Sequence, residues 1–320
     1  MDNTATPFLS NAVVYFNDSP TRSTVDISGS DVSPAATHFT NTTATSYTLQ
    51  GTNGIATGLV TKTGNGTVTI ANTNSYPGAT TVSGGALIVN GSIAASSLTT
   101  VETGGTLGGT GTTGTVKVTS GGTLAPTAQA SGDGLTVSGN LNFESGSIFE
   151  WDLNAGSSDP GAGLSNQGSY GQVASTSVTL PAAGSVVFKI VLGGNSFTDE
   201  FWNTHKQWSN LFTVGGSAYS LESLFSATNF SGAVAANGVV ANQGYFTFSG
   251  STLHWAAVPE PSGALAGLLI SAALFRRAGR SLADCAKLND TGENPWKRQE
   301  QAGPPPAVDP QGKPQEPGGH

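Results

Sequence analysis

The chain has 320 residues, enough for one or two domains, and only 10% of them are charged, against about 25% in ordinary soluble proteins. Its net charge is −8, and its few Lys and Arg residues before residue 258 are scattered. Nucleic-acid binding needs a clustered basic surface, so we expect no nucleic-acid partner. Glycine, threonine and serine dominate the composition, which favours short strands joined by tight turns. We therefore expect an all-β protein.

The first residues and the single cysteine bear on export and redox state. From Met1 the chain lacks the basic start and the apolar run of 7–15 residues that mark a secretory signal peptide. The first apolar patch, residues 12–16, is short and predicts a strand. Cys285 has no second cysteine to pair with, so an intramolecular disulfide is excluded and the fold depends on its core.

Residues 45–155 carry a repeat of Gly-rich turns and apolar positions. A period of 17–20 residues with short alternating strands predicts a parallel β-solenoid, whose coils stack about 4.8 Å apart around an apolar interior. The alternative is a disordered Gly/Thr-rich linker, and the regular apolar positions argue against it. We place this domain at residues 1–155, with Leu49 opening the series. The expected inward positions are Val68, Leu87, Leu107, Leu124 and Leu141.

After residue 155 the pattern changes but stays β-rich, and we place a second region at residues 156–257. Between them, residues 148–153 alternate between apolar and acidic side chains. Period-two alternation predicts a half-buried strand. Its apolar face would carry Phe149, Trp151 and Leu153, and its other face Glu150 and Asp152.

One helix is expected, over residues 198–212. Its aromatic and apolar residues fall near one face, and Asp199 and Glu200 suit a helix N-terminus. We expect the helix to cap an end of the solenoid and to hide strand edges that would otherwise aggregate. The alternative is an exposed aromatic face that binds sugars.

Residues 59–87 read Leu-Val-Thr-Lys-Thr-Gly-Asn-Gly-Thr-Val-Thr-Ile, then Asn-Ser-Tyr-Pro-Gly-Ala-Thr and Gly-Gly-Ala-Leu. This stretch resembles the autotransporter-associated β-strand repeat in its lysine, its paired glycines and its Tyr-Pro-Gly turn. The resemblance implies a right-handed parallel β-helix of the kind found in surface and secreted passenger regions.

A second resemblance covers the stretch from Val258 to Arg280. It contains Val258-Pro259-Glu260-Pro261, an apolar segment at residues 263–275 and a basic cluster of Arg276, Arg277 and Arg280. These three parts resemble a PEP-CTERM sorting signal. The resemblance implies recognition by an exosortase and export to the cell envelope, the cell surface or an extracellular polysaccharide matrix.

The length, charge and prolines of residues 258–280 fit a segment that anchors the chain in a membrane until a protease cuts it. Thirteen apolar residues in a helix would span about 20 Å, short of the ~30 Å core of a bilayer. The arginines would stay in the cytoplasm by the positive-inside rule. The prolines would keep the preceding chain extended for a protease. The alternative is a core helix followed by a basic turn.

Two features depart from the pattern of such exported proteins. They begin with a signal peptide, which leads us to expect a truncated or misassigned start. They also end shortly after the arginines, whereas residues 281–320 add a Pro-rich, charged stretch with the composition of a disordered tail. We expect residues 281–320 to arise from read-through or a frame error at the end of the gene; the alternative is a genuine cytoplasmic tail.

The sequence offers no catalytic, cofactor-binding or metal-binding residue that we would name. Residues 109–114 match G-x-G-x-x-G by letter, but they lie among strands rather than before a helix. His38, His205, His254 and His320 lack metal-ligand spacing. We therefore expect a non-enzymatic surface or matrix protein, with extracellular polysaccharide as a further candidate partner.

Two alternatives belong to other functional classes. A β-helix polysaccharide lyase or glycosidase could use Glu150 and Asp152, joined by Glu144, because glycosidases need two carboxylates roughly 5–9.5 Å apart. Lys117 and Lys189 are the cations available to a lyase. A glycan-binding module could instead use exposed indole rings, namely those of Trp202, Trp208 and Trp255.

Overall fold

The computed structural model describes residues 8–19, 22–127, 134–154, 169–182, 185–193 and 196–258. Most of the expected sorting signal lies outside the described residues, as do the apolar segment 263–275 and the tail 281–320. The sorting-signal residues concerned are Pro259, Glu260, Pro261, Arg276, Arg277 and Arg280.

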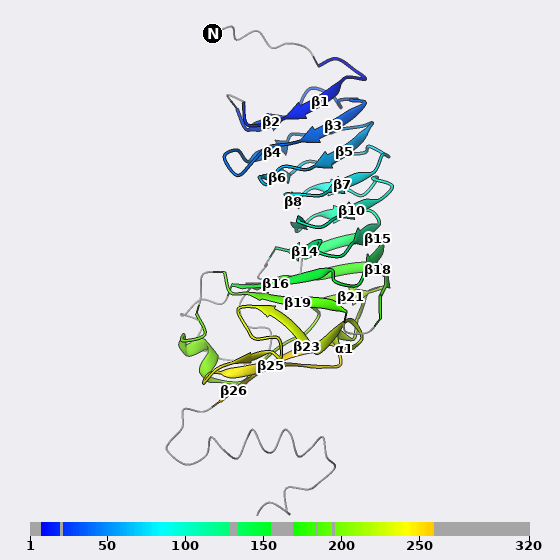
Figure 1. Cartoon of the computed structure of the whole chain (residues 1–320). Coiled ribbons are helices and arrows are strands. Elements are labelled where there is room, and N and C mark those ends of the chain that lie inside the picture. Colours follow the sequence, from blue (N-terminus) through cyan, green and yellow to red (C-terminus); the bar gives the residue numbers. More distant parts are fainter. Residues whose placement is uncertain are drawn as a thin grey trace, which may run out of the picture. The chain divides into compact units, whose positions relative to one another are not determined.

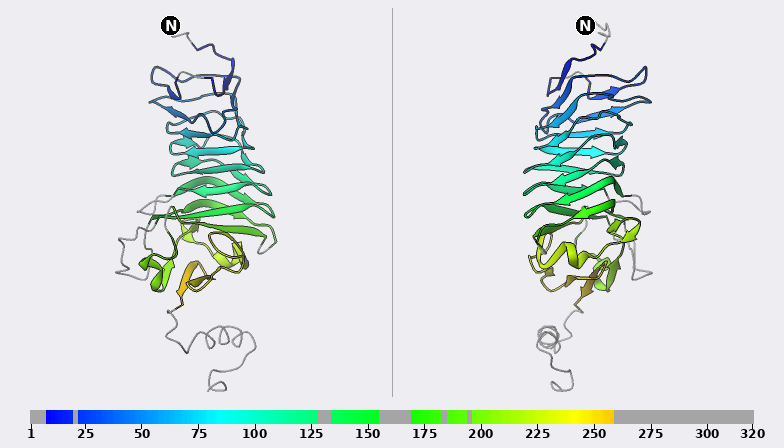
Figure 2. Two further views of the ribbon diagram at one scale, coloured as in Figure 1. Left: turned by 60° about the vertical axis from the view of Figure 1, so that its left-hand side comes forward. Right: turned by 90° about the vertical axis from the view of Figure 1, so that its right-hand side faces the viewer.

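The described chain winds through successive coils, and most coils give one strand to each of two parallel sheets (Figures 1 and 2). This arrangement agrees with the expected all-β solenoid. The first sheet has the order β1 (Val13–Phe16), β3 (Ala36–Phe39), β5 (Leu59–Lys62), β7 (Thr80–Val82), β10 (Thr99–Val101), β13 (Val116–Val118), β15 (Leu135–Phe143), β18 (Val173–Thr179), β21 (Phe212–Val214) and β22 (Ser217–Ala218), with β9 (Ser92–Ile93) and β12 (Thr112–Thr113) beside this path.

The second sheet lies across the interior from the first. It has the order β2 (Thr24–Asp26), β4 (Tyr47–Gln50), β6 (Thr67–Ile70), β8 (Gly85–Val89), β11 (Gly105–Gly109), β14 (Thr123–Pro126), β16 (Ile148–Asn154), β19 (Val186–Val191) and β23 (Phe225–Gly232), with β17 (Ser169–Tyr170) on β16. Parallel pairing continues from β16 to β19, on either side of residues 155–168. The coils therefore extend beyond the point where the sequence pattern changes.

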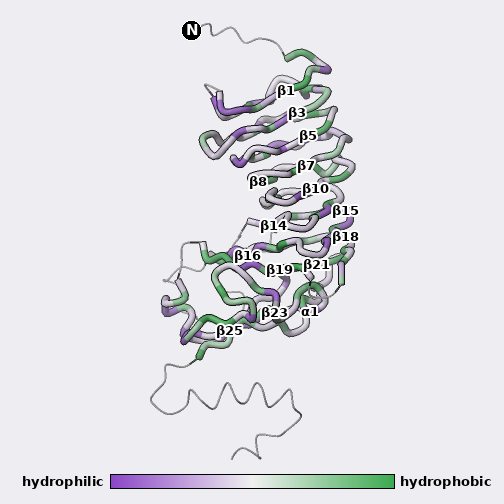
Figure 3. The backbone as a smooth tube through the Cα atoms, viewed as in Figure 1, coloured by the Kyte–Doolittle hydropathy of each residue, from purple (hydrophilic) through white to green (hydrophobic). Residues whose placement is uncertain are grey.

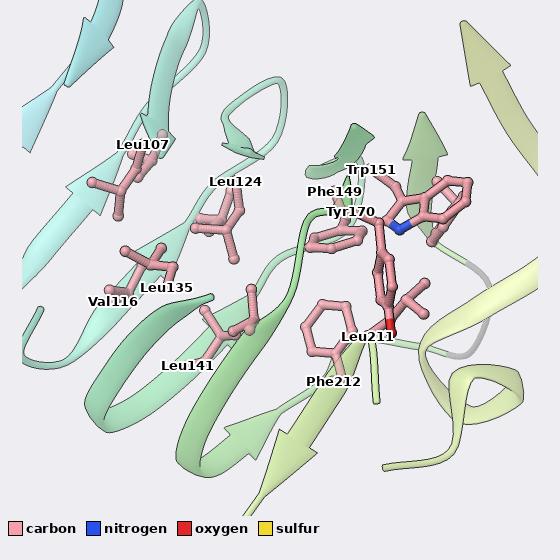
Figure 4. Close-up of a cluster of buried hydrophobic side chains, with 14 of the residues drawn as sticks. Leu107, Val116, Leu124, Leu135, Leu141, Phe149, Trp151, Tyr170, Leu211 and Phe212 are labelled. Carbon is pink, nitrogen blue, oxygen red and sulfur yellow. The ribbon is translucent and has the colours of Figure 1, made fainter. Parts of the chain in front are cut away.

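The interior rows follow the expected register with two corrections. Val68, Leu87, Leu107 and Leu124 are register partners in the second sheet and are fully buried, as expected. Leu141 is also fully buried, as expected, but it pairs with Val116 in the first sheet, and the next member of the second-sheet row is Phe149 (Figure 4). Similarly, the register partner of Val68 on the preceding coil is Tyr47, whereas Leu49 pairs with Ile70. Each coil contains two apolar strands, so spacing alone does not tell which strand supplies a given leucine.

Glycine is required where the chain turns into the second sheet. Gly85 has φ +59°, a left-handed conformation that other residues rarely adopt. A Cβ placed there would lie 2.2 Å from the carbonyl oxygen of Gly66 in the coil before it. The Gly-Gly pairs of the repeat thus serve both the turn and the close stacking of coils.

The expected helix over residues 198–212 is wrong. The described chain forms one 3-10 turn, η1 (Glu200–Asn203), followed by strand β20 (Lys206–Trp208). β20 pairs antiparallel with β26 (Thr252–Ala257), and these pairings outweigh the local helical spacing. Asn210, with φ +58°, then turns the chain into β21.

A small antiparallel sheet covers the last coils instead. It has the order β20, β26, β25 (Gly244–Ser249) and β24 (Val239–Val240), and a short helix, α1 (Leu221–Leu224), lies before β23. Phe246 of β25 lies 6.3 Å from Trp151 and Phe248 lies 5.3 Å from Phe188, measured between ring centroids. The covering role expected of the helix therefore belongs to this sheet.

Candidate functional site

Two of the three carboxylates that an enzyme could use, Glu150 and Glu144, form separate ion pairs. Strand β16 places Phe149, Trp151 and Leu153 inside, as expected, and turns Glu150 outward. Because β16 and β19 pair in register, Glu150 faces Lys189, and its Oε2 lies 2.7 Å from the lysine Nζ. The geometry makes Glu150 an ion-pair partner on the sheet surface.

Glu144 does not join this pair. It follows β15 of the first sheet, and its Oε1 lies 2.7 Å from Nζ of Lys117. Asp152 stays beside Glu150 on β16, where partial burial and then the charge of Glu150 raise the pKa of its carboxyl group. Both candidate lysines are thus held by carboxylates, on different sheets.

His38 and the glycine motif form part of the solenoid, His254 lies in β26 of the antiparallel sheet, and His320 lies outside the described residues. His38 stacks on Tyr15 with ring centroids 4.9 Å apart, and its Nδ1 lies 2.6 Å from Oγ1 of Thr61 on the next coil. Residues 109–114 run from the last residue of β11 through β12, and the next element is strand β13 rather than a helix. In the part of the chain that the structure describes, no group of three His, Cys, Asp or Glu side chains could hold a metal ion.

The aromatic sugar-binding face is wrong for this chain. Trp202, Trp208 and Trp255 are exposed by only 1%, 0% and 1%. The indole Nε1–H of Trp255 donates a hydrogen bond of 2.8 Å to the carbonyl oxygen of Trp202. These rings form the interior beneath the antiparallel sheet and present no platform to a ligand.

The structure instead reveals a polar groove on the outer side of the first sheet, where β15, β18 and β21 begin. Its volume is ≈ 570 Å³. Residues that define it come from four parts of the stack: Thr110, Thr136, Gln172, Ala174, Asn210 and Thr213. All are uncharged, so the groove offers hydroxyl and amide groups.

Sequence reasoning missed this groove. Thr136, Ala174 and Thr213 form its floor because they are register partners on adjacent strands. They lie far apart along the chain, and nothing in their local sequence forms a motif. The sequence signal was a polar residue, Thr136, between two apolar residues at the start of β15, a pattern that predicts an outward side chain.

Of the expected sorting signal, only Val258 is described. It follows β26 and its backbone N–H donates to the carbonyl oxygen of Gln243, while its side chain is 38% exposed. Across the ranges that the structure describes, we find no helix with the length and apolar character needed to cross a bilayer.

Comparison with known proteins concerns the solenoid. Residues 60–89 match the passenger-associated-transport-repeat family, which supports the resemblance to autotransporter repeats. The chain is also 49% identical over 71 residues to the adhesin BmaC autotransporter of Brucella suis biovar 1 (strain 1330), a match that covers 22% of this chain. The chain spans about 2% of the length of that adhesin. The matched repeat runs from β5 to β8, so its sequence similarity coincides with two stacked coils.

Proposed function

We propose that this chain is a non-enzymatic exported protein of the cell envelope, the cell surface or the extracellular matrix, in which the solenoid is a rigid display body. One observation carries the proposal: residues 60–89 match a passenger repeat and form coils in the stack. A stack of this kind offers an extended outer surface because each coil needs only its neighbours for burial.

Sorting by an exosortase through residues 258–280 completes the proposal. The motif begins directly after β26, and Val258 is exposed, so a protease could reach the chain where the folded body ends. The apolar segment 263–275 would anchor the chain transiently, and Arg276, Arg277 and Arg280 would keep the following residues in the cytoplasm.

Fractionation of the native host tests both parts. We expect the mature protein in the envelope or matrix fraction, and mass spectrometry of its termini should place its C-terminus within or just after residues 258–261. A cytoplasmic protein that retains residues 281–320 would contradict the proposal.

Charge removal tests the sorting signal separately. The triple variant Arg276→Ala, Arg277→Ala and Arg280→Ala should fold but lose retention or processing in a host with an exosortase. A matched triple, Lys287→Ala, Lys297→Ala and Arg298→Ala, removes the same charge from the tail and should be processed normally. Equal processing of the two triple variants would contradict the proposed sorting signal.

A further inference from the structure

We propose that the polar groove beside β15, β18 and β21 binds a neutral oligosaccharide chain that lies along the stack of coils. The proposal rests on the proposed surface role for its biological setting, since an exported body would meet glycans. Its physical basis lies in the groove itself, which makes it separately testable.

The floor of the groove repeats from coil to coil. Thr136 pairs with Ala174, and Ala174 pairs with Thr213, in parallel register. Each lies between two residues that face or border the interior, so its own side chain faces out. Paired strands lie about 4.8 Å apart, which gives the floor equal steps along the axis. A chain ligand built from repeating units suits such a floor better than a single compact molecule.

A buried acceptor in the groove lacks a partner. Gln172 lines the groove and is only 7% exposed, and its Oε1 has no hydrogen-bond partner within the described part of the chain. Buried polar atoms are normally paired, and because this oxygen has almost no accessible surface, a donor in the groove would reach it once the amide turns outward. A sugar hydroxyl is a donor of the right kind.

The other polar groups of the groove are also available. Thr136, Thr213 and Asn210 have no side-chain hydrogen bond among the described residues. Threonine hydroxyls both donate and accept, and the asparagine amide does both with separate atoms. Hydroxyl groups of a sugar need this mixture of donors and acceptors.

The lining favours a neutral glycan over other polymers. The described lining contains no charged side chain, so an acidic polysaccharide or a charged peptide would gain no ion pair there. Its apolar members, Val173, Ala174 and Ala218, are small and form no pocket for a large peptide side chain. Hydrogen bonding to hydroxyl groups is the recognition that remains.

Calorimetric titration of the full chain with cellohexaose, maltohexaose, laminarihexaose and chitohexaose tests the proposal, with an oligogalacturonate as the acidic comparison. At least one neutral chain should bind, and the acidic one should not. Ala174→Trp fills the floor and should weaken binding by about tenfold or more. Thr81→Trp, on the same outer face at β7, should leave the affinity unchanged.

A second variant guards against misfolding. Asn210→Gly removes the amide but keeps the φ of +58° that glycine adopts freely, so binding should weaken while the melting temperature holds. Asn242→Gly, at φ +63° away from the groove, is the control. The proposal is overturned if no neutral hexasaccharide binds, if the groove and control variants bind equally, or if only charged glycans or peptides bind. None of these results depends on where the protein is sorted.

Discussion

The two ends of the described solenoid differ in how much apolar side-chain surface they expose. At the first coil, Val13 is 50% exposed and Tyr15 64% exposed, and a hollow of ≈ 320 Å³ opens among side chains such as Val14 and Val25. At the other end, β25 places Phe246 and Phe248 over the last coils, and Figure 3 shows hydrophobic and hydrophilic residues mixed along that part of the tube. A coil buries its interior only against a neighbouring coil. The interior of a terminal coil must therefore be buried by a structure other than the repeat.

The side chains change along with the position in the stack. Middle coils fill the second-sheet row with Val68, Leu87 and Leu107, whereas the last coils fill it with Phe149 and then Phe188. Figure 4 shows Leu107, Leu124 and Phe149 of this row. Aromatic rings bury more area each and contact one another in edge-to-face geometry. The covered end therefore concentrates its stabilising contacts in few residues, while the middle distributes them evenly.

The largest loss of stability should come from a charge in the middle of the stack. Leu107→Asp would bury an unpaired carboxylate between Leu87 and Leu124, which proteins tolerate poorly. We expect loss of the cooperative unfolding transition or a decrease of more than about 4 kcal/mol in the free energy of unfolding. Thr106→Asp, on the outward neighbour, is the matched control in denaturant titration. Similar curves for the two variants would contradict the solenoid interior.

Removing an indole ring at the covered end should rank second. Trp255→Ala deletes a buried ring and its hydrogen bond to Trp202, and we expect a cost of about 3–5 kcal/mol. Tyr15→Ala, at the first coil, should cost less, about 0.5–1.5 kcal/mol, because this exposed ring loses only its stacking on His38. Thermal unfolding of both variants measures this difference. Equal losses of stability would show that the two ends of the stack do not differ in packing.

A buried lysine in the repeat should make stability depend on pH. Lys62 is fully buried, its Nζ donates to the carbonyl oxygens of Gly64 and Gly84, and burial lowers its pKa to about 8. Below pH 8 the folded state carries the full cost of the buried charge. Between pH 8 and 10.5 the unfolded state alone retains the proton, so this cost falls as pH rises.

Comparison with Lys62→Met isolates this contribution. Relative to the variant, the wild type should gain up to about 3 kcal/mol between pH 7 and pH 10.5. Tyrosine ionisation affects both proteins and cancels in the difference. Urea titrations at several pH values measure it, and a difference that does not change with pH would show that Lys62 titrates normally.

The smallest effect should come from the surface ion pair. Glu150→Gln weakens the contact with Lys189 in partly exposed surroundings, so we expect a change of about 0–1 kcal/mol that shrinks in high salt. Polysaccharide-cleavage assays of wild type and variant should both show no turnover. Turnover in the wild type that disappears in Glu150→Gln would favour the enzyme alternative.

The sequence allowed the solenoid to be predicted because stacking imposes the same demand on every coil. Val68, Leu87 and Leu107 recur at nearly constant spacing, and this periodicity is visible without any partner. Leu141 is buried as predicted, but it does not continue the row of Leu124, because spacing does not distinguish the two strands of one coil. In the later coils the connections are longer, so the next row member, Phe149, lies farther along the chain from Leu124 than the repeat predicts.

Contacts between distant segments explain what could not be predicted. Residues 198–212 have helical spacing, but β20 finds its partner in β26, which local patterns do not reveal. The groove has the same origin, because Thr136, Ala174 and Thr213 meet only through coil register. Burial of Trp202, Trp208 and Trp255 likewise depends on the sheet that those pairings create.

Among the described residues, the first coil has exposed apolar side chains whereas the last coils contact the rings of β25, and this difference affects how the stack opens. Each coil contacts only its neighbours, so in this chain opening can start at the first described coil, which contains Val13 and Tyr15, and proceed one coil at a time. Opening from the other end must first break the ring contacts between β25 and the last coils. Amide hydrogen exchange should therefore be fastest in β1 and β2 and slowest in β16 and β19, with protection rising along the stack.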